Sequence, residues 1–360
     1  MNYEQRYFLY LVKSYLNGEK ISEPNSDIDW HSVYLYACEQ SLYNLFYSAL
    51  VKITNKPNEQ IMAKLKSKYK RSLMKYTNNN FEAKQTVELI ASNGIKVMPL
   101  KGYFIKEYYM QPEFRYVSDL DIITDDLNKT TDLLLENGYE IVKDDIHHTA
   151  LIKNGFVTEV HKSLFVGKLK KYFLNPFENA FELSNNIYRM EDNYFYAYVI
   201  AHFAYHFSAS GAGIRSIIDV YYLNKNLNIS DKSLISDCSL SQFEQEILSF
   251  ALNLFEGREY DDTIAEILYL SHTSGLYENR AAIDSSRHGK SRLIKKVFPS
   301  MDYLSTAYPI ERKSQLPYFW AKRLIDASRR DNDNTYDVIV DENRVKKFND
   351  VISKLGLEDF

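Results

Sequence analysis

The chain contains few of the residues that disulfide-linked or fibrous proteins depend on. Its 360 residues include 2 cysteines, 12 glycines and 8 prolines. Cys38 and Cys238 lie far apart and lack the spacing of a metal site, which excludes a disulfide framework and indicates a reducing compartment. No uninterrupted apolar run has the length of about 20 residues that a membrane-spanning helix needs. These absences predict a cytoplasmic protein that does not contact a membrane.

A strong excess of one charge is also missing. The formal net charge is −4, which does not fit a protein that coats nucleic acid over its whole surface. The first residues, MNYEQRYFLYLVKSYLNG, include an early acidic residue and no small-residue cleavage site. They predict an amphipathic helix and not a signal peptide.

Aromatic residues, in contrast, are abundant, with 30 Tyr and 20 Phe. So many large rings beside so few glycines and prolines predict helix-rich layers. Residues 29–52, which Asp29 is placed to cap, have apolar residues at helical spacing. A second helical stretch runs from Pro57 to the stop signal Asn93-Gly94. Its lysine-rich middle, AKLKSKYKRSLMKY, predicts a solvated helix face.

The pattern changes between residues 95 and 165. Two short apolar runs, IKVMPL and VSDLDIIT, alternate with two helical segments, YFIKEYYM and roughly 128–137. Three β-like runs follow, YEIV, TALIK and FVTEVHKSLF, and Asn154-Gly155 between the last two is a strong hairpin signal. The order β-α-β-α-β-β-β predicts a compact α/β unit.

From about residue 170 the apolar spacing becomes helical again. We therefore expect an α+β fold, predominantly helical, in which a small mixed-sheet core is flanked by N-terminal helices and a large C-terminal helical region. The expected domains are residues 1–93, 94–168 and 169–360. Residues 280–330 are strongly basic and the tail that follows is acidic, so the basic segment either guides a nucleic-acid acceptor or pairs with the tail.

Two aspartates interrupt the apolar run VSDLDIIT. On a strand, residues i and i+2 point to the same face, so Asp119 and Asp121 project together while Leu120 and Ile122 face the core. Two such charges repel unless a cation lies beside them, and Mg²⁺ or Mn²⁺ is the natural partner of carboxylate oxygens. Glu159, in a neighbouring strand, is the candidate for a third carboxylate of a two-metal site.

The turn before this strand suits a phosphate. In PLKG, Gly102 stands between a strand and a helix, where the backbone approaches a ligand closely and the helix start supplies N–H donors. Lys101 either neutralises phosphate charge or is a solvated lysine. Arg115 either binds phosphate through two N–H groups or orders the loop by a salt bridge to one of the aspartates. This layout is typical of nucleotidyl transfer.

The stretches LKGYFIKEYYMQPEFRYVSDLDIIT and GYEIV…HHTALIKNGFVTEVHKSL resemble a bacterial family of nucleotidyltransferases in the DNA polymerase β-like superfamily. The shared features are the Lys-Gly turn, an arginine before the aspartate strand, and an E-x-H strand. AHFAYHF…IRSIIDVYYL extends the likeness into the helical region, so that it covers residues 29–325. The resemblance implies that residues 94–168 form the nucleotidyltransferase core. It also implies that Asp119, Asp121 and Glu159 are catalytic metal ligands.

One residue departs from the wider superfamily. Gly-Ser or Gly-Gly is usual at the turn, whereas Tyr103 follows Gly102 here. The missing serine hydroxyl removes one phosphate contact. The candidate nucleotide-binding and phosphate-binding residues are Lys101, Gly102, Tyr103 and Arg115.

Several residues outside the core are candidates for the substrate cleft. His202 and His206 lie four residues apart on a helix, a spacing that suits either packed, hydrogen-bonded histidines or a metal. Arg215 and Asp219 have the spacing of a helical ion pair, and the resemblance suggests that this helix pair closes over the cleft. Histidines 147, 148 and 161 fall near the sheet, where they either pack as ordinary side chains or include one that orients a carboxylate or the substrate. His161 is the one included among the cleft candidates.

These features predict metal-dependent transfer of a nucleoside monophosphate from an NTP, such as ATP, to a hydroxyl acceptor, with release of pyrophosphate. The acceptor could be RNA, a protein or a small molecule. A non-catalytic, antitoxin-like binding module of the same fold is the alternative, supported by the missing turn serine. Metal-dependent phosphohydrolysis is less favoured, because the chain has no His-Asp dipeptide.

Overall fold

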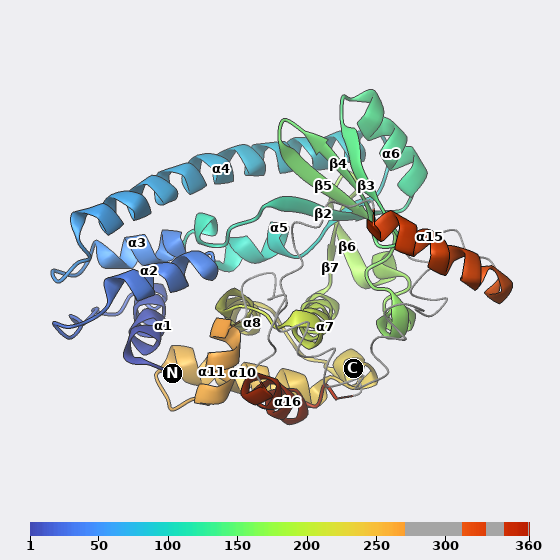
Figure 1. The fold of residues 1–360 in the computed structure, drawn as a ribbon. Coiled ribbons are helices and arrows are strands. Elements are labelled where there is room, and N and C mark those ends of the chain that lie inside the picture. Colours follow the sequence, from blue (N-terminus) through green and yellow to red (C-terminus); the bar gives the residue numbers. More distant parts are fainter. Residues whose placement is uncertain (271–311, 329–341, 359) are drawn as a thin grey trace.

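A mixed sheet of seven strands, in the order β3-β4-β5-β2-β1-β7-β6, lies between helices on both faces (Figure 1). The computed structural model describes residues 1–270, 312–328, 342–358 and 360. Most of these residues are helical, which confirms the predicted α+β, predominantly helical fold. The basic segment 280–330 is described only at 312–328, so most of the predictions for it lie outside the described residues. None of the described helices is long and apolar enough to cross a membrane.

The N-terminal part is helical, as predicted. Asp29 caps its helix by accepting a hydrogen bond from the backbone N–H of His31. The predicted helix 29–52 is in fact two helices, because Ser41 adopts a positive φ of 53° that an α-helix cannot accommodate. The lysines of the long fourth helix face solvent, as expected. The helices are α1 (Tyr3–Leu16), α2 (Trp30–Glu39), α3 (Tyr43–Leu50) and α4 (Glu59–Ser92).

The element order between residues 95 and 165 matches the prediction. The strand β2 pairs parallel to β5 and antiparallel to β1, and the β4–β5 hairpin turns at Asn154 and Gly155, which both have positive φ. The elements are β1 (Val97–Pro99), α5 (Gly102–Ile105), β2 (Asp119–Thr124), α6 (Leu127–Glu136), β3 (Glu140–Asp144), β4 (His148–Lys153) and β5 (Phe156–His161). Short 3₁₀ turns, Lys106–Tyr108 and Pro112–Phe114, continue the chain after α5.

The prediction of helices from residue 170 onward is wrong for one hairpin. Strands β6 (Ala180–Ser184) and β7 (Ile187–Met190) extend the sheet beyond residue 168, and β7 pairs parallel to β1. The signal for this hairpin is its turn, where Asn185 and Asn186 both have positive φ. The hairpin lies at the end of the sheet, and Phe181 and Leu183 of β6 alternate with polar residues but are 42% and 49% exposed. Strands of 5 and 4 residues are too short for this alternation to be a strong signal.

Two apolar cores hold the sheet. One lies between the C-terminal half of α4, α6 and one face of the sheet, and Leu120 and Ile122 of β2 belong to it. The other core joins the N-terminal helices to the C-terminal helices and the opposite face of the sheet, which Ile123 enters. Asp119 and Asp121 share the face of Ile123 and therefore point towards the C-terminal helices. These helices are α7 (Asp192–Ser210), α8 (Ile214–Asn226), α9 (Ser233–Asp237), α10 (Ser241–Glu256), α11 (Asp262–Leu270), α15 (Leu316–Ser328) and α16 (Glu342–Lys354).

The turn between β1 and α5 has an unusual backbone. Lys101 has φ 44° and ψ −113°, a conformation that glycine adopts readily and other residues rarely do. The turn closes through the N–H of Tyr103, which donates to the carbonyl of Leu100 at 3.2 Å. The Lys101 side chain reaches β2 and donates to Asp121 at 3.0 Å. The turn thus aims the ammonium group at the acidic strand while straining the backbone.

This strain predicts that Lys101→Gly is more stable than Lys101→Ala. Both variants lose the ammonium group, but only alanine keeps a Cβ on the strained backbone, which costs about 1 to 2 kcal/mol. Thermal and urea unfolding of both variants measure the difference. The matched control is Lys106, which has helical φ −56° and ψ −30°. There, glycine should be less stable than alanine by roughly 0.5 to 1 kcal/mol. Equal stability of the two variants at residue 101 would contradict the assignment of strain.

Candidate active site

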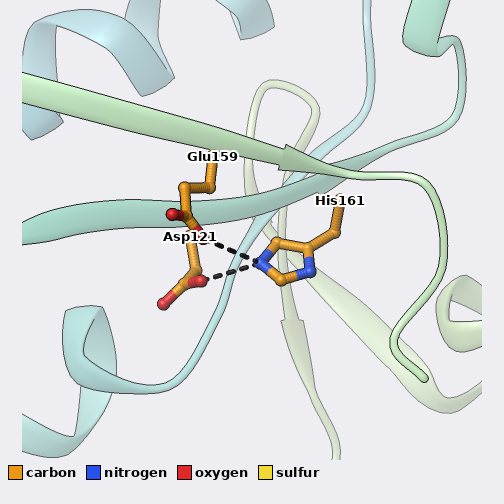
Figure 2. A group of neighbouring side chains, drawn as sticks. All are labelled: Asp121, Glu159 and His161. Carbon is orange, nitrogen blue, oxygen red and sulfur yellow. Dashed lines mark hydrogen bonds and ion pairs between the residues drawn. The ribbon is translucent and has the colours of Figure 1, made fainter. Parts of the chain in front are cut away.

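Strands β2 and β5 bring two of the predicted carboxylates together. Asp121 lies directly opposite Glu159 in the parallel pair, and His161 follows on the same face of β5. Figure 2 shows the three side chains converging, with the imidazole beside both carboxylates. The His161 Nε2 atom lies 2.7 Å from Asp121 Oδ1 and 3.9 Å from Glu159 Oε2. Among the described residues, these three side chains place metal-ligating atoms within 4.8 Å of one another.

Asp119 occupies the start of β2, two residues from Asp121. The Ser118 hydroxyl donates to its Oδ1 atom at 3.1 Å. Asp119 lines the neighbouring cleft but does not belong to the close group of Asp121, Glu159 and His161. The three predicted carboxylates are therefore adjacent, with Asp121 in the middle and Asp119 and Glu159 on either side.

The negative charges of Asp119, Asp121 and Glu159 are not balanced by the cations around them. Burial and the charge of Asp121 raise the pKa of Asp119, and burial together with the two aspartates raises the pKa of Glu159. Burial would also raise the pKa of Asp121, but the Lys101 ammonium and His161 outweigh it and hold that pKa well below its usual range. Asp121 in turn raises the pKa of Lys101 against the effect of burial. Lys101 and Arg215 both act to lower the pKa of Asp119, but these two cations do not balance three carboxylates, a donor set that fits a divalent cation with oxygen preference.

A cleft of about 330 Å³ opens beside the acids. One wall comes from the turn after β1 and from the loop before β2, and the other comes from α7 and α8. The predicted residues that line it are Lys101, Gly102, Arg115, Asp119, Asp121, His202, His206, Arg215 and Asp219. Helices α7 and α8 thus line the cleft, and their closure over a substrate stays a prediction. Residues that the sequence did not suggest also line it, namely Ile105, Tyr116, Val117, Ser118, Val199, Phe203, Ala212 and Ser216.

Tyr103 is not part of this lining. Its ring packs against the core between α4 and the sheet, and the Lys106 ammonium lies 5.0 Å from the ring centroid. It borders a smaller hollow of about 20 Å³ on that side of Gly102. The structure therefore places the side chain at the position of the missing serine away from the larger cleft.

Arg115 connects the two walls of the cleft. Its Nε and Nη2 atoms donate to the carboxylate of Asp219 at 3.0 and 2.8 Å, and the Tyr109 hydroxyl donates to the same carboxylate at 2.7 Å. The side chains of Arg115 and Asp219 are 11% and 8% exposed. The Arg115 salt bridge is thus made to an acid on α8 and not to Asp119 or Asp121.

The predicted ion pair between Arg215 and Asp219 is wrong. Asp219 faces the loop before β2, so its carboxylate binds Arg115, and this tertiary contact prevails over the four-residue spacing on the helix. Arg215 donates to the carbonyl of Tyr116 at 3.3 Å instead. Burial and the nearby Arg115 charge lower the pKa of Arg215. Among the ion pairs of the described residues, none involves Arg215, so its guanidinium keeps donors for a ligand in the cleft.

The histidines have distinct surroundings. His202 and His206 bond to each other through their Nε2 atoms at 3.1 Å. Burial and the Lys101 charge lower the pKa of His202 well below its usual range. Within the described ranges, no further ligand completes a metal site with this pair. His148 has a role that the sequence did not single out, because its Nε2 atom lies 3.6 Å from Glu159 Oε1.

Residues 26–255 match the family described as "Uncharacterised nucleotidyltransferase". The match spans more than half of the chain and includes every residue of the site. The chain belongs to this family. The family match thus confirms the nucleotidyltransferase part of the resemblance seen in the sequence. A comparison with curated proteins finds no match.

The buried salt bridge between Arg115 and Asp219 predicts that Asp219→Asn strongly lowers the stability of the protein. The variant leaves the Arg115 guanidinium buried without a counter-charge, which costs about 3 to 5 kcal/mol. Urea unfolding measures this loss of stability. The control is Glu266→Gln, which breaks an exposed pair with Lys347 at 3.0 Å and should cost less than about 1 kcal/mol. Similar small losses in both variants would show that the Arg115–Asp219 pair does not stabilise the fold.

The raised pKa of Asp119 predicts that Asp119→Asn stabilises the metal-free protein at neutral pH. The folded state disfavours the charged carboxylate, so this penalty is present above the folded pKa and disappears below the unfolded value of about 3.9. With EDTA present, the midpoint of thermal unfolding should be higher for the variant than for the wild-type protein at pH 7, and this difference should largely disappear near pH 3.5.

The control for Asp119→Asn is a carboxylate whose pKa shifts the other way. Burial would raise the pKa of Asp145, but Lys143 and the backbone N–H groups of His147 and His148 lower it. Asp145→Asn should therefore destabilise the protein at pH 7 and lose that effect in acid. The same sign of change in both variants would contradict the electrostatic account of Asp119.

Proposed function

We propose that the protein transfers a nucleoside monophosphate from an NTP to a hydroxyl acceptor and releases pyrophosphate. The observation that carries this proposal is the pairing of Asp121 with Glu159 across β2 and β5, at the edge of a cleft lined by basic side chains. Membership of the nucleotidyltransferase family supports the same chemistry. The order of turn, aspartate strand and E-x-H strand further supports a place in the DNA polymerase β-like superfamily, in a bacterial branch. A cytoplasmic setting is part of the proposal.

The carboxylates would hold the metal. Asp119, Asp121 and Glu159 supply oxygen ligands for Mg²⁺ or Mn²⁺, and their unbalanced charge supports such an ion. When bound, divalent ions at such a site neutralise the triphosphate and stabilise charge on the attacking and leaving oxygens.

The basic residues of the cleft would bind the triphosphate. Lys101 lies at the turn, and the Arg115 Nη1 atom lies 2.8 Å from the position that a Cβ at residue 102 would occupy. Only glycine leaves room there for both the guanidinium and a ligand close to the backbone. Arg215 faces the same space from α8. Lys101, Arg215 and the Nη1 group that Arg115 does not use for Asp219 can replace the phosphate contact that the missing serine hydroxyl would have made.

The proposed step is a substitution at the α-phosphorus. The acceptor oxygen forms a bond to that phosphorus while the bond to the oxygen bridging the α- and β-phosphates breaks, and pyrophosphate leaves with the bonding electrons. The hydroxyl proton passes to a carboxylate of the cluster, for which Glu159 is the candidate, since its raised pKa makes it the better base. The residues of α7 and α8 would select the acceptor, whether RNA, a protein or a small molecule.

Thermal unfolding with ligands tests the proposal. The wild-type protein is heated with ATP, GTP, CTP or UTP at millimolar concentration, with and without Mg²⁺ or Mn²⁺. A nucleotide present at 100 times its Kd stabilises the folded state by about 2.7 kcal/mol and raises the midpoint. We expect a rise that needs both the metal and one of the nucleotides. Release of pyrophosphate in the presence of candidate acceptors then tests the transfer itself.

Two variants make the result specific. The Asp119→Asn/Asp121→Asn double variant should lose the rise, whereas Glu136→Gln, on the exposed surface of α6, should keep it. The absence of any rise with a folded wild-type protein would favour the non-catalytic binding module. A rise that persists in the double variant would place nucleotide binding elsewhere.

A further inference from the structure

His161 occupies a position between two carboxylates. Its Nε2 atom points at Asp121 Oδ1 and Glu159 Oε2, as the dashed lines in Figure 2 mark. We propose that Asp121, Glu159 and His161 form a mixed nitrogen–oxygen metal site that prefers a transition-metal ion, Mn²⁺ in particular, over Mg²⁺. The role of such an ion in transfer rests on the proposed function, but its binding requires no nucleotide.

The backbone holds the three ligands in register. Glu159 and His161 are two residues apart on β5, so their side chains project from the same face, and Asp121 lies opposite Glu159 on β2. The three side chains are 14%, 24% and 11% exposed, for Asp121, Glu159 and His161 respectively. Because two hydrogen-bonded strands carry them, the ligands need no large rearrangement to meet one ion.

The existing hydrogen bond marks where the ion would lie. Ionised Asp121 is a hydrogen-bond acceptor, so the short contact with His161 requires a hydrogen on Nε2. A metal ion would replace this hydrogen between the same two atoms, and Glu159 Oε2 lies on the side from which it would complete the set. Lys101, which shares Asp121 Oδ1, leaves the second carboxylate oxygen of Asp121 for an ion at the Asp119 side.

His148 supports the site from outside. It lies opposite His161 in the antiparallel β4–β5 pair, and its Nε2 atom faces Glu159 Oε1 at 3.6 Å. This contact leaves the other oxygen, Oε2, turned towards His161. His148 thus borders Glu159 on the side away from His161, the place from which outer partners commonly orient metal-ligating carboxylates, and we assign it this positioning role when the metal is bound.

The donor set decides the preference between metals. Mg²⁺ favours six oxygen ligands and keeps its waters, whereas an imidazole nitrogen suits first-row transition-metal ions such as Fe²⁺ and Zn²⁺. Mn²⁺ accepts both carboxylate oxygen and imidazole nitrogen, so it fits this site and also the all-oxygen position beside Asp119. The chain would then hold two chemically different metal positions that share Asp121.

Electron paramagnetic resonance of Mn²⁺ tests the proposal on the full chain without nucleotide. Loss of the free-ion signal measures binding, and nitrogen coupling in the spectrum of the bound ion reports an imidazole ligand. We expect binding with nitrogen coupling in the wild-type protein, and no displacement by an equal concentration of Mg²⁺. His161→Asn should remove the coupling and weaken binding at least about tenfold.

Two further variants distinguish a residue that binds the metal from residues that only lie near it. His148→Asn should weaken Mn²⁺ binding about tenfold and keep the nitrogen coupling, because it acts through Glu159. His147→Asn, next to it in the chain, should leave both measurements unchanged. Circular dichroism establishes that each variant is folded.

Three results would overturn the inference: bound Mn²⁺ without nitrogen coupling, coupling that survives in His161→Asn, or no binding until an NTP is added. The third result would leave the proposed transfer intact, since the nucleotide would then supply the missing ligands. Nitrogen-coupled Mn²⁺ in a protein that binds no NTP would support the metal site and contradict the proposed transfer.

Discussion

The ion pair between Lys101 and Asp121 is the contact on which the rest of the site depends. It joins the turn after β1 to the acidic strand at 3.0 Å, and it offsets one of the three clustered negative charges. Lys101, whose side chain makes this contact, is also the residue with the strained backbone. Asp121 is also the residue that Glu159 and His161 face. The Asp121 carboxylate therefore contacts the turn through Lys101, binds the His161 imidazole and lies beside Glu159.

A second contact determines the shape of the space around these groups. Arg115 and Asp219 hold the loop before β2 against α8, and the Tyr109 hydroxyl completes the bonding of the carboxylate. Because this pair satisfies two charges inside the protein, Arg215 remains as the cation on α8 that faces the cleft. The walls are thus fixed by one arginine, while a second is available for a ligand.

The central α/β unit could be predicted from sequence because its signals are local. The i, i+2 spacing of Asp119 and Asp121 on a strand and the Asn154-Gly155 turn each determine the backbone within a few residues. The unusual backbone of the turn after β1 belongs to Lys101 and not to Gly102. The β6–β7 hairpin was missed because its strands have only 5 and 4 residues, too few for the alternation of Phe181 and Leu183 with polar residues to stand out. Its Asn-Asn turn was the clearer signal.

The partners of charged side chains were harder to predict, since they depend on contacts distant in sequence. Asp219 has Arg215 at helical spacing, but it binds Arg115, 104 residues away, because both side chains are buried at the same place. The nearness of His161 to both carboxylates follows from the parallel register of β2 and β5. A single sequence does not contain that register.

The length of α4 has a structural consequence. At 34 residues this helix is about 50 Å long, and Figure 1 shows it running from the N-terminal helices to the sheet. Leu65 packs in the core of the helical layers and Ile90 in the core beneath the sheet. One continuous helix thus joins the two cores. The turn after β1 and the start of β2 lie on the side of the cleft that this helix supports, and α7 and α8 form the opposite wall.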